Sequence, residues 1–151
     1  MRPTLYDAAG GEQAFVALAR AHHARCLADP ELSHPFDRDD LDPEHVERLA
    51  AYWAEVLGGP PRFSRECADQ SAVLRLHAGN GDVSDLARRF VACFVAAADD
   101  AGLPADPVLR AALRDYMVWA VGDVLAYSEV DAAVPERVAM PRWDWDGPVR
   151  S

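Results

Sequence analysis

The sequence predicts an all-helical domain. Apolar residues recur with the 3.6-residue period of an amphipathic helix, and no segment alternates apolar and polar residues as a strand would. Glycine and proline clusters divide the chain into four longer helices with unusually long irregular connections between them. Long connections inside a compact domain are usually functional, and here they leave room for a cavity between the helices.

Glycines and prolines separate the helices expected in the first half of the chain. Residues 4–9 predict a short helix that a double glycine stops, and residues 12–28 predict a long one. Residues 43–57 predict the next helix, because its proline falls in the first turn and Gly-Gly-Pro at 58–60 ends it. The apolar stripes of the two long helices consist of Phe15, Leu18, His22, Cys26, Val46, Leu49, Trp53 and Val56.

The second half of the chain predicts three further helices. Residues 61–69 are expected to form a loop and residues 70–77 a short helix. Two long helices are then expected at residues 83–101 and 106–127. Their inward-facing residues are Leu86, Phe90, Cys93, Phe94, Ala97, Leu109, Leu113, Tyr116, Ala120 and Val124.

The domain is expected to cover residues 1–127, since 151 residues suffice for one domain with a core of its own. Residues 128–151 are rich in proline and predict a tail that is dispensable for cofactor binding. The alternative is that Trp143 and Trp145 dock on the body of the protein or on a second subunit.

Composition excludes several classes of function. A formal net charge of -10 is the opposite of the basic face that nucleic-acid binding needs. No apolar run is long enough to span a membrane, and the first residues lack the apolar core of a signal peptide, so the cytoplasm is the expected location. The three cysteines form no CxxC pair, which argues against a thiolate zinc site.

The stretch RLHAGNGDVSDL, residues 75–86, ends one expected helix and starts the next within a few residues. It carries His77 in apolar surroundings that include Leu76, which a buried ligand histidine needs. His45 lies on an apolar helical stripe, where a polar group is costly without a partner. Two imidazoles from separate helices facing one cavity would suit a haem iron. The alternative is a simple turn in which His77 interacts with the last carbonyls of its helix.

Three stretches resemble the truncated haemoglobins, specifically the second group of these bacterial globins. TLYDAAGGEQAF at 4–15 resembles the opening of that family, and RLAAYWAEVLGGPPRFS at 48–64 resembles its distal helix and the following Gly-Gly-Pro and aromatic. FVACF at 90–94 resembles the segment in which an aromatic lines the haem pocket. The resemblance covers residues 4–127 and implies a two-over-two helical sandwich around haem b.

The resemblance assigns roles to individual residues. His77 falls on the proximal ligand of the haem iron. Phe36 falls on the aromatic that packs on the haem face. His45 and Leu49 fall on the distal positions that face the bound gas, which makes His45 a candidate hydrogen-bond donor or second ligand of the iron.

This chain departs from the family pattern at several positions, including the Pro-Phe pair that usually follows the proximal histidine and is replaced here by Ala-Gly-Asn. His23 stands where the family usually has a tyrosine that hydrogen-bonds the ligand, and His22 stands on the preceding phenylalanine. Phe90 replaces the usual tryptophan, and Leu76 replaces the arginine before the proximal histidine. Two distal histidines therefore take the place of the usual tyrosine and tryptophan network.

Three functions are compatible with these residues. The first is a haem-binding globin, monomeric or homodimeric, that binds or transports oxygen or another diatomic gas such as carbon monoxide or nitric oxide. The second is an enzyme on the same scaffold, in which a distal histidine assists peroxide cleavage or an oxygen-dependent biosynthetic oxidation by acid–base transfer. The third is a helical sensor or interaction module without haem.

Overall fold

The structure, a computed structural model, describes residues 2–32, 44–68, 70, 73–74, 84–124, 126, 133–135 and 138–149. Its helices are α1 (Leu5–Ala9), α2 (Glu12–Ala28), α4 (His45–Val56), α5 (Arg62–Glu66), α7 (Ser84–Asp100) and α8 (Pro107–Val124). A two-residue antiparallel hairpin, β1 (Trp143–Asp144) with β2 (Gly147–Pro148), is the sheet among these residues. The predicted all-α class is confirmed.

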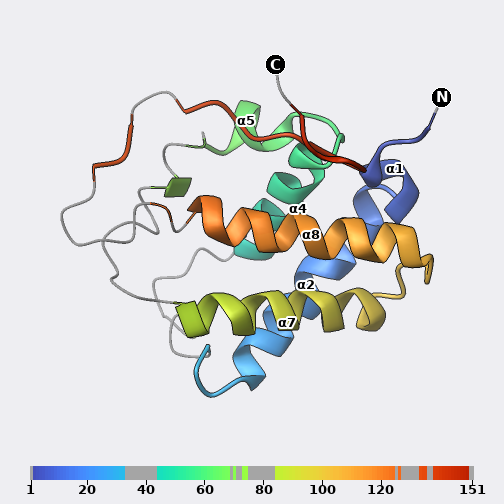
Figure 1. Cartoon of the computed structure of the whole chain (residues 1–151), viewed down its shortest axis with the longest axis vertical. Coiled ribbons are helices and arrows are strands. Elements are labelled where there is room, and N and C mark those ends of the chain that lie inside the picture. Colours follow the sequence, from blue (N-terminus) through green and yellow to red (C-terminus); the bar gives the residue numbers. More distant parts are fainter. Residues whose placement is uncertain are drawn as a thin grey trace.

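The four long helices form two pairs. The helices α7 and α8 lie side by side, and α2 packs against α4 behind them (Figure 1). Contacts between α2 and α7 join the two pairs into the two-over-two sandwich that the resemblance implies. Within the described residues, no helix combines the length and apolarity needed to cross a membrane.

The predicted apolar stripes form the core between the helix pairs. Phe15, Leu18 and Cys26 of α2 are at most 1% exposed, and Leu109, Leu113 and Tyr116 of α8 are at most 2% exposed. Burying a large apolar side chain stabilises the fold by about 1.5–3 kcal/mol, so these stripes supply much of the stability. Burial differs along the apolar stripe of α4: Trp53 is buried, whereas Leu49 is only half-buried.

A double glycine after α4 allows α1 to pack closely. A Cβ on Gly58 would lie 2.7 Å from the Cβ of Thr4, and one on Gly59 would lie 2.7 Å from the ring of Tyr6. Gly58 also has a φ of +102°, which side chains rarely adopt. The amide of Tyr6 donates to the carbonyl of Leu57 at 2.9 Å across this contact. The glycines therefore fix the end of α4 against the start of the chain.

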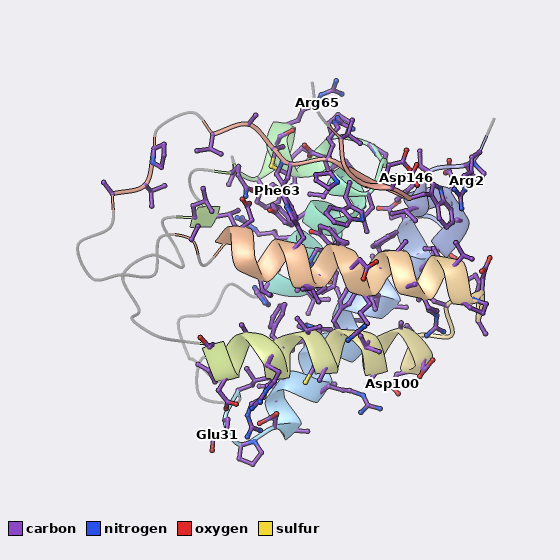
Figure 2. The ribbon with its side chains drawn as sticks, viewed as in Figure 1. Arg2, Glu31, Phe63, Arg65, Asp100 and Asp146 are labelled. Carbon is purple, nitrogen blue, oxygen red and sulfur yellow. The ribbon has the colours of Figure 1, made fainter. Side chains whose placement is uncertain are left out.

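The prediction of a loop at residues 61–69 is wrong in part, because α5 occupies five of these positions. Its helix depends on packing that a local pattern does not reveal. The ring of Phe63 packs edge-on against Tyr52 of α4, with ring centroids 5.0 Å apart, and points into the body of the protein (Figure 2). The amide of Ser64 donates to the buried Glu55 carboxylate at 2.9 Å, which satisfies a free N–H in the first turn.

The other predicted helices agree with the structure to within a few residues where it describes them. The observed α2 has the predicted bounds, and α7 lies one residue inside its prediction at each end. Of the short helix predicted at 70–77, Gln70, Val73 and Leu74 are helical, and its other residues lie outside the described ones.

The C-terminal hairpin docks on the body, which is the second of the two alternatives for residues 128–151. Trp143 is 8% exposed and packs against Tyr116 and Trp119 of α8, with ring centroids 5.9 and 5.4 Å apart. Trp145 donates its indole N–H to the carbonyl of Pro3 at 2.7 Å, and the Arg2 guanidinium lies 4.0 Å from its ring centroid. Figure 2 shows Arg2 and Asp146 at the same end of the molecule, beside α1. The hairpin thus holds both ends of the chain together.

Replacing Trp143 by alanine should lower the free energy of unfolding by about 2 kcal/mol, because the burial of its ring is lost. The cost is no larger, since the terminal segment can undock and so leaves no closed cavity. Trp145→Ala is the matched control. It loses one hydrogen bond and a half-exposed ring contact, so its expected cost is only about 1 kcal/mol. Urea unfolding measures both, and equal costs would show that Trp143 docking contributes little. Haem uptake should be unchanged in both variants.

Candidate functional site

The structure brings four of the predicted site residues to one region. His23 lies on α2, His45 and Leu49 on α4, and Phe90 on α7, and α2 packs against both of the other helices. The other three predicted site residues, Phe36, Leu76 and His77, lie outside the described residues.

Two imidazoles meet between α2 and α4. The ring centroids of His23 and His45 are 5.6 Å apart, the ring planes are inclined by 56°, and both side chains are half-buried. A neutral imidazole carries one N–H donor and one acceptor nitrogen. The pair therefore presents donor and acceptor groups together at a half-open position between two helices.

His22, the neighbour of His23, points into the core instead. It is fully buried, and its Nε2 donates to the carbonyl of Phe90 at 3.3 Å. Its ring lies edge-on to Phe90 and Trp53, with centroids 4.3 and 5.4 Å away. The Cys26 thiol, one turn later, is 3.7 Å from Nδ1. His22 therefore fixes the backbone of α7 at Phe90 against α2.

Burial determines the charge of His22. Burial is the main cause that lowers the pKa of the imidazole to about 4; the hydrogen bond to the Phe90 carbonyl opposes the shift, and the nearby His23 and His45 add to it. His22 is therefore neutral near pH 7. Burial likewise raises the pKa of the Cys26 thiol far above its ordinary value, so this cysteine is a protonated core residue.

Ion pairs between α2 and α7 keep Phe90 in place. Arg89, adjacent to Phe90, reaches Asp29 just after α2, with Nη1 and Oδ1 3.2 Å apart. At the other end of the contact, Arg25 pairs with Asp100, which Figure 2 shows at the end of α7. Exposed pairs of this kind contribute at most about 1 kcal/mol each, so they mainly set the register of the two helices.

The region around the two imidazoles fits haem. Leu49, one turn after His45 on α4, and Phe90 on α7 are half-buried apolar side chains that pack against the core and leave part of their surface uncovered by the described residues. Haem needs an apolar wall of this kind, and it brings four nitrogen ligands of its own, so one histidine suffices to hold the iron. Within the part of the chain that the structure describes, no three side chains of the metal-binding types converge on a common point.

Comparison with known proteins identifies the family. The sequence profile of the bacterial-like globins matches residues 4–118, which is most of the chain. The chain belongs to the bacterial-like globin family. Membership of a globin family implies a haem-binding protein.

Solved structures show that this globin shares its fold with other bacterial haemoglobins, truncated ones among them. It is 31% identical to a thermostable haemoglobin from Thermobifida fusca, with 89% of this chain and 100% of that one covered and a TM-score of 0.66. It is 27% identical to a haemoglobin from Chloroflexus aurantiacus, with 85% and 99% covered and a TM-score of 0.68. The group II truncated haemoglobin of Bacillus anthracis shares the fold at 22% identity, with 82% and 92% covered and a TM-score of 0.70. None of the curated protein sequences matches this globin.

Sequence reasoning missed a buried polar junction in this globin. Gln70 has no exposed surface; its Oε1 accepts from the Tyr52 hydroxyl at 2.7 Å, and its Nε2 donates to Asp123 Oδ2 at 3.2 Å. The only local signal is a single glutamine at the start of the short helix predicted at 70–77. Its partners are 18 and 53 residues away in the sequence, so the pattern around it does not indicate them.

Proposed function

We propose that this globin holds haem b through His77 and binds a diatomic gas on the side of the haem where His23 and His45 lie. When bound, haem supplies an iron with one position for the gas. The observation that carries the proposal is the His23–His45 pair beside the apolar wall of Leu49 and Phe90, in a chain whose family implies haem. A neutral imidazole donates a hydrogen bond to a partly anionic ligand such as oxygen, and charge-assisted hydrogen bonds are the strong ones.

Each residue has a separate task in this proposal. His77 anchors the haem, Phe36 packs on the haem face as the family resemblance implies, and Leu76 adds to the apolar surroundings of His77. His45 donates to the ligand, and His23 lies against its ring. His22 takes no part in ligand contact, because it is buried and its Nε2 is committed to the Phe90 carbonyl.

Absorption spectra of the purified protein in the ferric, ferrous and carbon monoxide forms test this proposal. A Soret band that shifts on reduction and again with carbon monoxide is the expected result. A protein that takes up no haem from a stoichiometric mixture would support the haem-free module instead. The ferric spectrum also reports whether a distal histidine occupies the sixth position, because a second imidazole ligand gives a low-spin iron.

His45→Ala should speed the dissociation of oxygen. Losing one hydrogen bond to a charged acceptor costs about 1.5–3 kcal/mol, which corresponds to roughly a 10- to 100-fold faster off-rate. If the wild-type ferric form is low-spin, the same variant should become high-spin. Stopped-flow displacement of oxygen by carbon monoxide measures the rate, and His23→Ala is the matched variant on α2. An effect in His23→Ala alone would assign the donor to α2 instead of α4.

The histidine pair also favours a second function, peroxide cleavage by acid–base transfer. Two adjacent imidazoles provide one group to accept a proton and one to donate it, which is the arrangement that such a reaction needs. Turnover of hydrogen peroxide with a reducing dye separates the two functions. Turnover that persists unchanged in the His23→Ala, His45→Ala double variant would exclude the pair from that role.

A further inference from the structure

Two of the three cysteines meet where α2 packs against α7. Cys26 of α2 has no exposed surface, whereas Cys93 of α7 is half-buried. A hydrogen bond joins the two thiol groups across the helix contact. We call Cys26 and Cys93 the cysteine pair. The third cysteine, Cys67, directly follows α5 and is also half-buried.

Two contacts keep α2 and α7 in register around the cysteine pair. His22 lies one turn before the α2 cysteine, and its Nε2 donates at 3.3 Å to the carbonyl of Phe90, one turn before the α7 cysteine. Asp29 lies one turn after the α2 cysteine and accepts from Arg89 at 3.2 Å, also one turn before the α7 cysteine. Sliding α7 along α2 would break both contacts, so the native fold keeps the two thiols opposite each other.

The two thiols differ in their ability to react. A thiolate is the nucleophile in thiol chemistry, and burial raises the pKa of both thiols. For Cys93, the hydrogen bond from Cys26 opposes this rise in pKa. The nearby Asp29 raises the pKa of Cys93 further, whereas the guanidinium groups of Arg25 and Arg89 lower it. For Cys26, the contact with Cys93 adds to the effect of burial. The half-buried Cys93 is therefore the thiol that reacts first.

We infer that Cys26 and Cys93 form a reversible disulfide that clamps α2 to α7, by exchange with the disulfide of a small thiol. Two groups that are held in contact react as parts of one molecule, which favours the bond between them over a bond to any thiol in solution. The clamp would hold the helix that carries His23 to the helix that carries Phe90. The inference concerns the polypeptide alone and does not depend on the proposed function.

The exchange takes place in two steps. In the first, the Cys93 thiolate attacks one sulfur of the small disulfide; the S–S bond breaks, one small thiolate leaves, and Cys93 carries the other half as a mixed disulfide. In the second, the Cys26 sulfur attacks the Cys93 sulfur and expels the remaining half as a thiolate. The protons of the two cysteines end on the two released thiols. Two protein thiols are thereby oxidised, and one small disulfide is reduced to two thiols.

Intact-mass measurement after incubation with glutathione disulfide, with oxygen excluded, tests the inference on the purified full chain. The wild type should lose the mass of two hydrogen atoms, and a non-reduced digest should link the peptides of Cys26 and Cys93. Dithiothreitol should restore the original mass. Cys67→Ser is the matched control and should behave like the wild type. A persistent glutathione adduct on the wild type, a link to Cys67 or a covalent dimer would overturn the inference.

Single variants of the cysteine pair test the order of the two steps. Cys26→Ala should stop after the first step and retain glutathione on Cys93. Cys93→Ser should take up no glutathione at Cys26, because a fully buried thiol is closed to a small disulfide. Equal adducts at these two positions would overturn the assignment of Cys93 as the first thiol. If either variant fails to fold, the digest of the wild type still decides whether the bond forms.

Thermal melts of the oxidised and reduced wild type test the clamp itself. A disulfide between residues so far apart in the sequence restricts the unfolded chain, so oxidation should raise the melting temperature by about 5–10 °C. Dithiothreitol should reverse this rise, and Cys67→Ser should show the same rise as the wild type. Cys26→Ala treated with glutathione disulfide should show none, because it closes no loop. A melting temperature that stays unchanged in a fully oxidised wild type would overturn the clamp.

Discussion

Replacing His77 by alanine should abolish the haem spectrum of this globin, or leave a weak band of altered position. Every other haem contact in the proposal is apolar or lies on the distal side, so His77 supplies the only proximal bond. Haem at about a thousand times its Kd stabilises a native protein by about 4 kcal/mol. His77→Ala should lose this contribution and melt at the temperature of the haem-free wild type.

Absorption spectra and thermal melts with and without added haem measure both effects. His34→Ala is the matched control, since it removes a histidine to which the proposal gives no role, and it should keep the Soret band. A wild-type spectrum in His77→Ala would contradict the proximal assignment. A variant with no Soret band and an unchanged melting temperature would show that haem binds without stabilising the fold.

The long helices could be predicted from the sequence because their signal is local. The stripe of α2 repeats over 17 residues between a double glycine and the Asp-Pro pair that follows, and its bounds were predicted correctly. The five-residue α5 could not be predicted in this way. Its helix relies on Phe63 packing against Tyr52 and on Glu55 accepting from Ser64, contacts that only the folded chain makes.

The candidate site could likewise be predicted only in part. Resemblance to a family places His23 and His45 on the distal side, but they are 22 positions apart in the sequence, and only the packing of α2 on α4 brings their rings together. Adjacent histidines on one helix point about 100° apart, so one of His22 and His23 must turn away from the pair. The structure assigns the buried position to His22.

The buried His22 should make this globin lose stability in mild acid. Its folded-state pKa is about 4 and its unfolded value is about 6.5, because burial disfavours the imidazolium. Between these pH values the unfolded chain binds more protons than the native one, so the free energy of unfolding rises with pH through this window and levels off above it. Lowering the pH from about 7 to about 4 should therefore cost about 3 kcal/mol at this one residue.

His22→Phe should remove this pH dependence. Phenylalanine keeps the edge-on contacts with Phe90 and Trp53 and does not titrate. It loses the hydrogen bond to the Phe90 carbonyl, so at pH 7.5 the variant should be about 1 kcal/mol less stable than the wild type. At pH 4.5 the order of stability should reverse. Only the wild type takes up a proton at this ring when it unfolds, and this uptake favours its unfolded state in acid. His22→Leu is a second non-titrating variant with a smaller side chain.

Urea unfolding followed by far-UV circular dichroism, at steps from pH 7.5 to 4.5, measures the difference between variant and wild type. Other titrating groups contribute equally to variant and wild type and cancel in this difference. They include the carboxyls of Asp29, Asp85 and Asp100. Hydrogen bonds and arginine partners lower the pKa values of these carboxyls, so their contribution to stability is lost only in stronger acid. A difference that stays constant over this range would show that His22 is not buried in neutral form. If the stability of both variants relative to the wild type increases as the pH falls towards about 4, the buried imidazole is the source of the acid sensitivity, because neither Phe nor Leu titrates at this position.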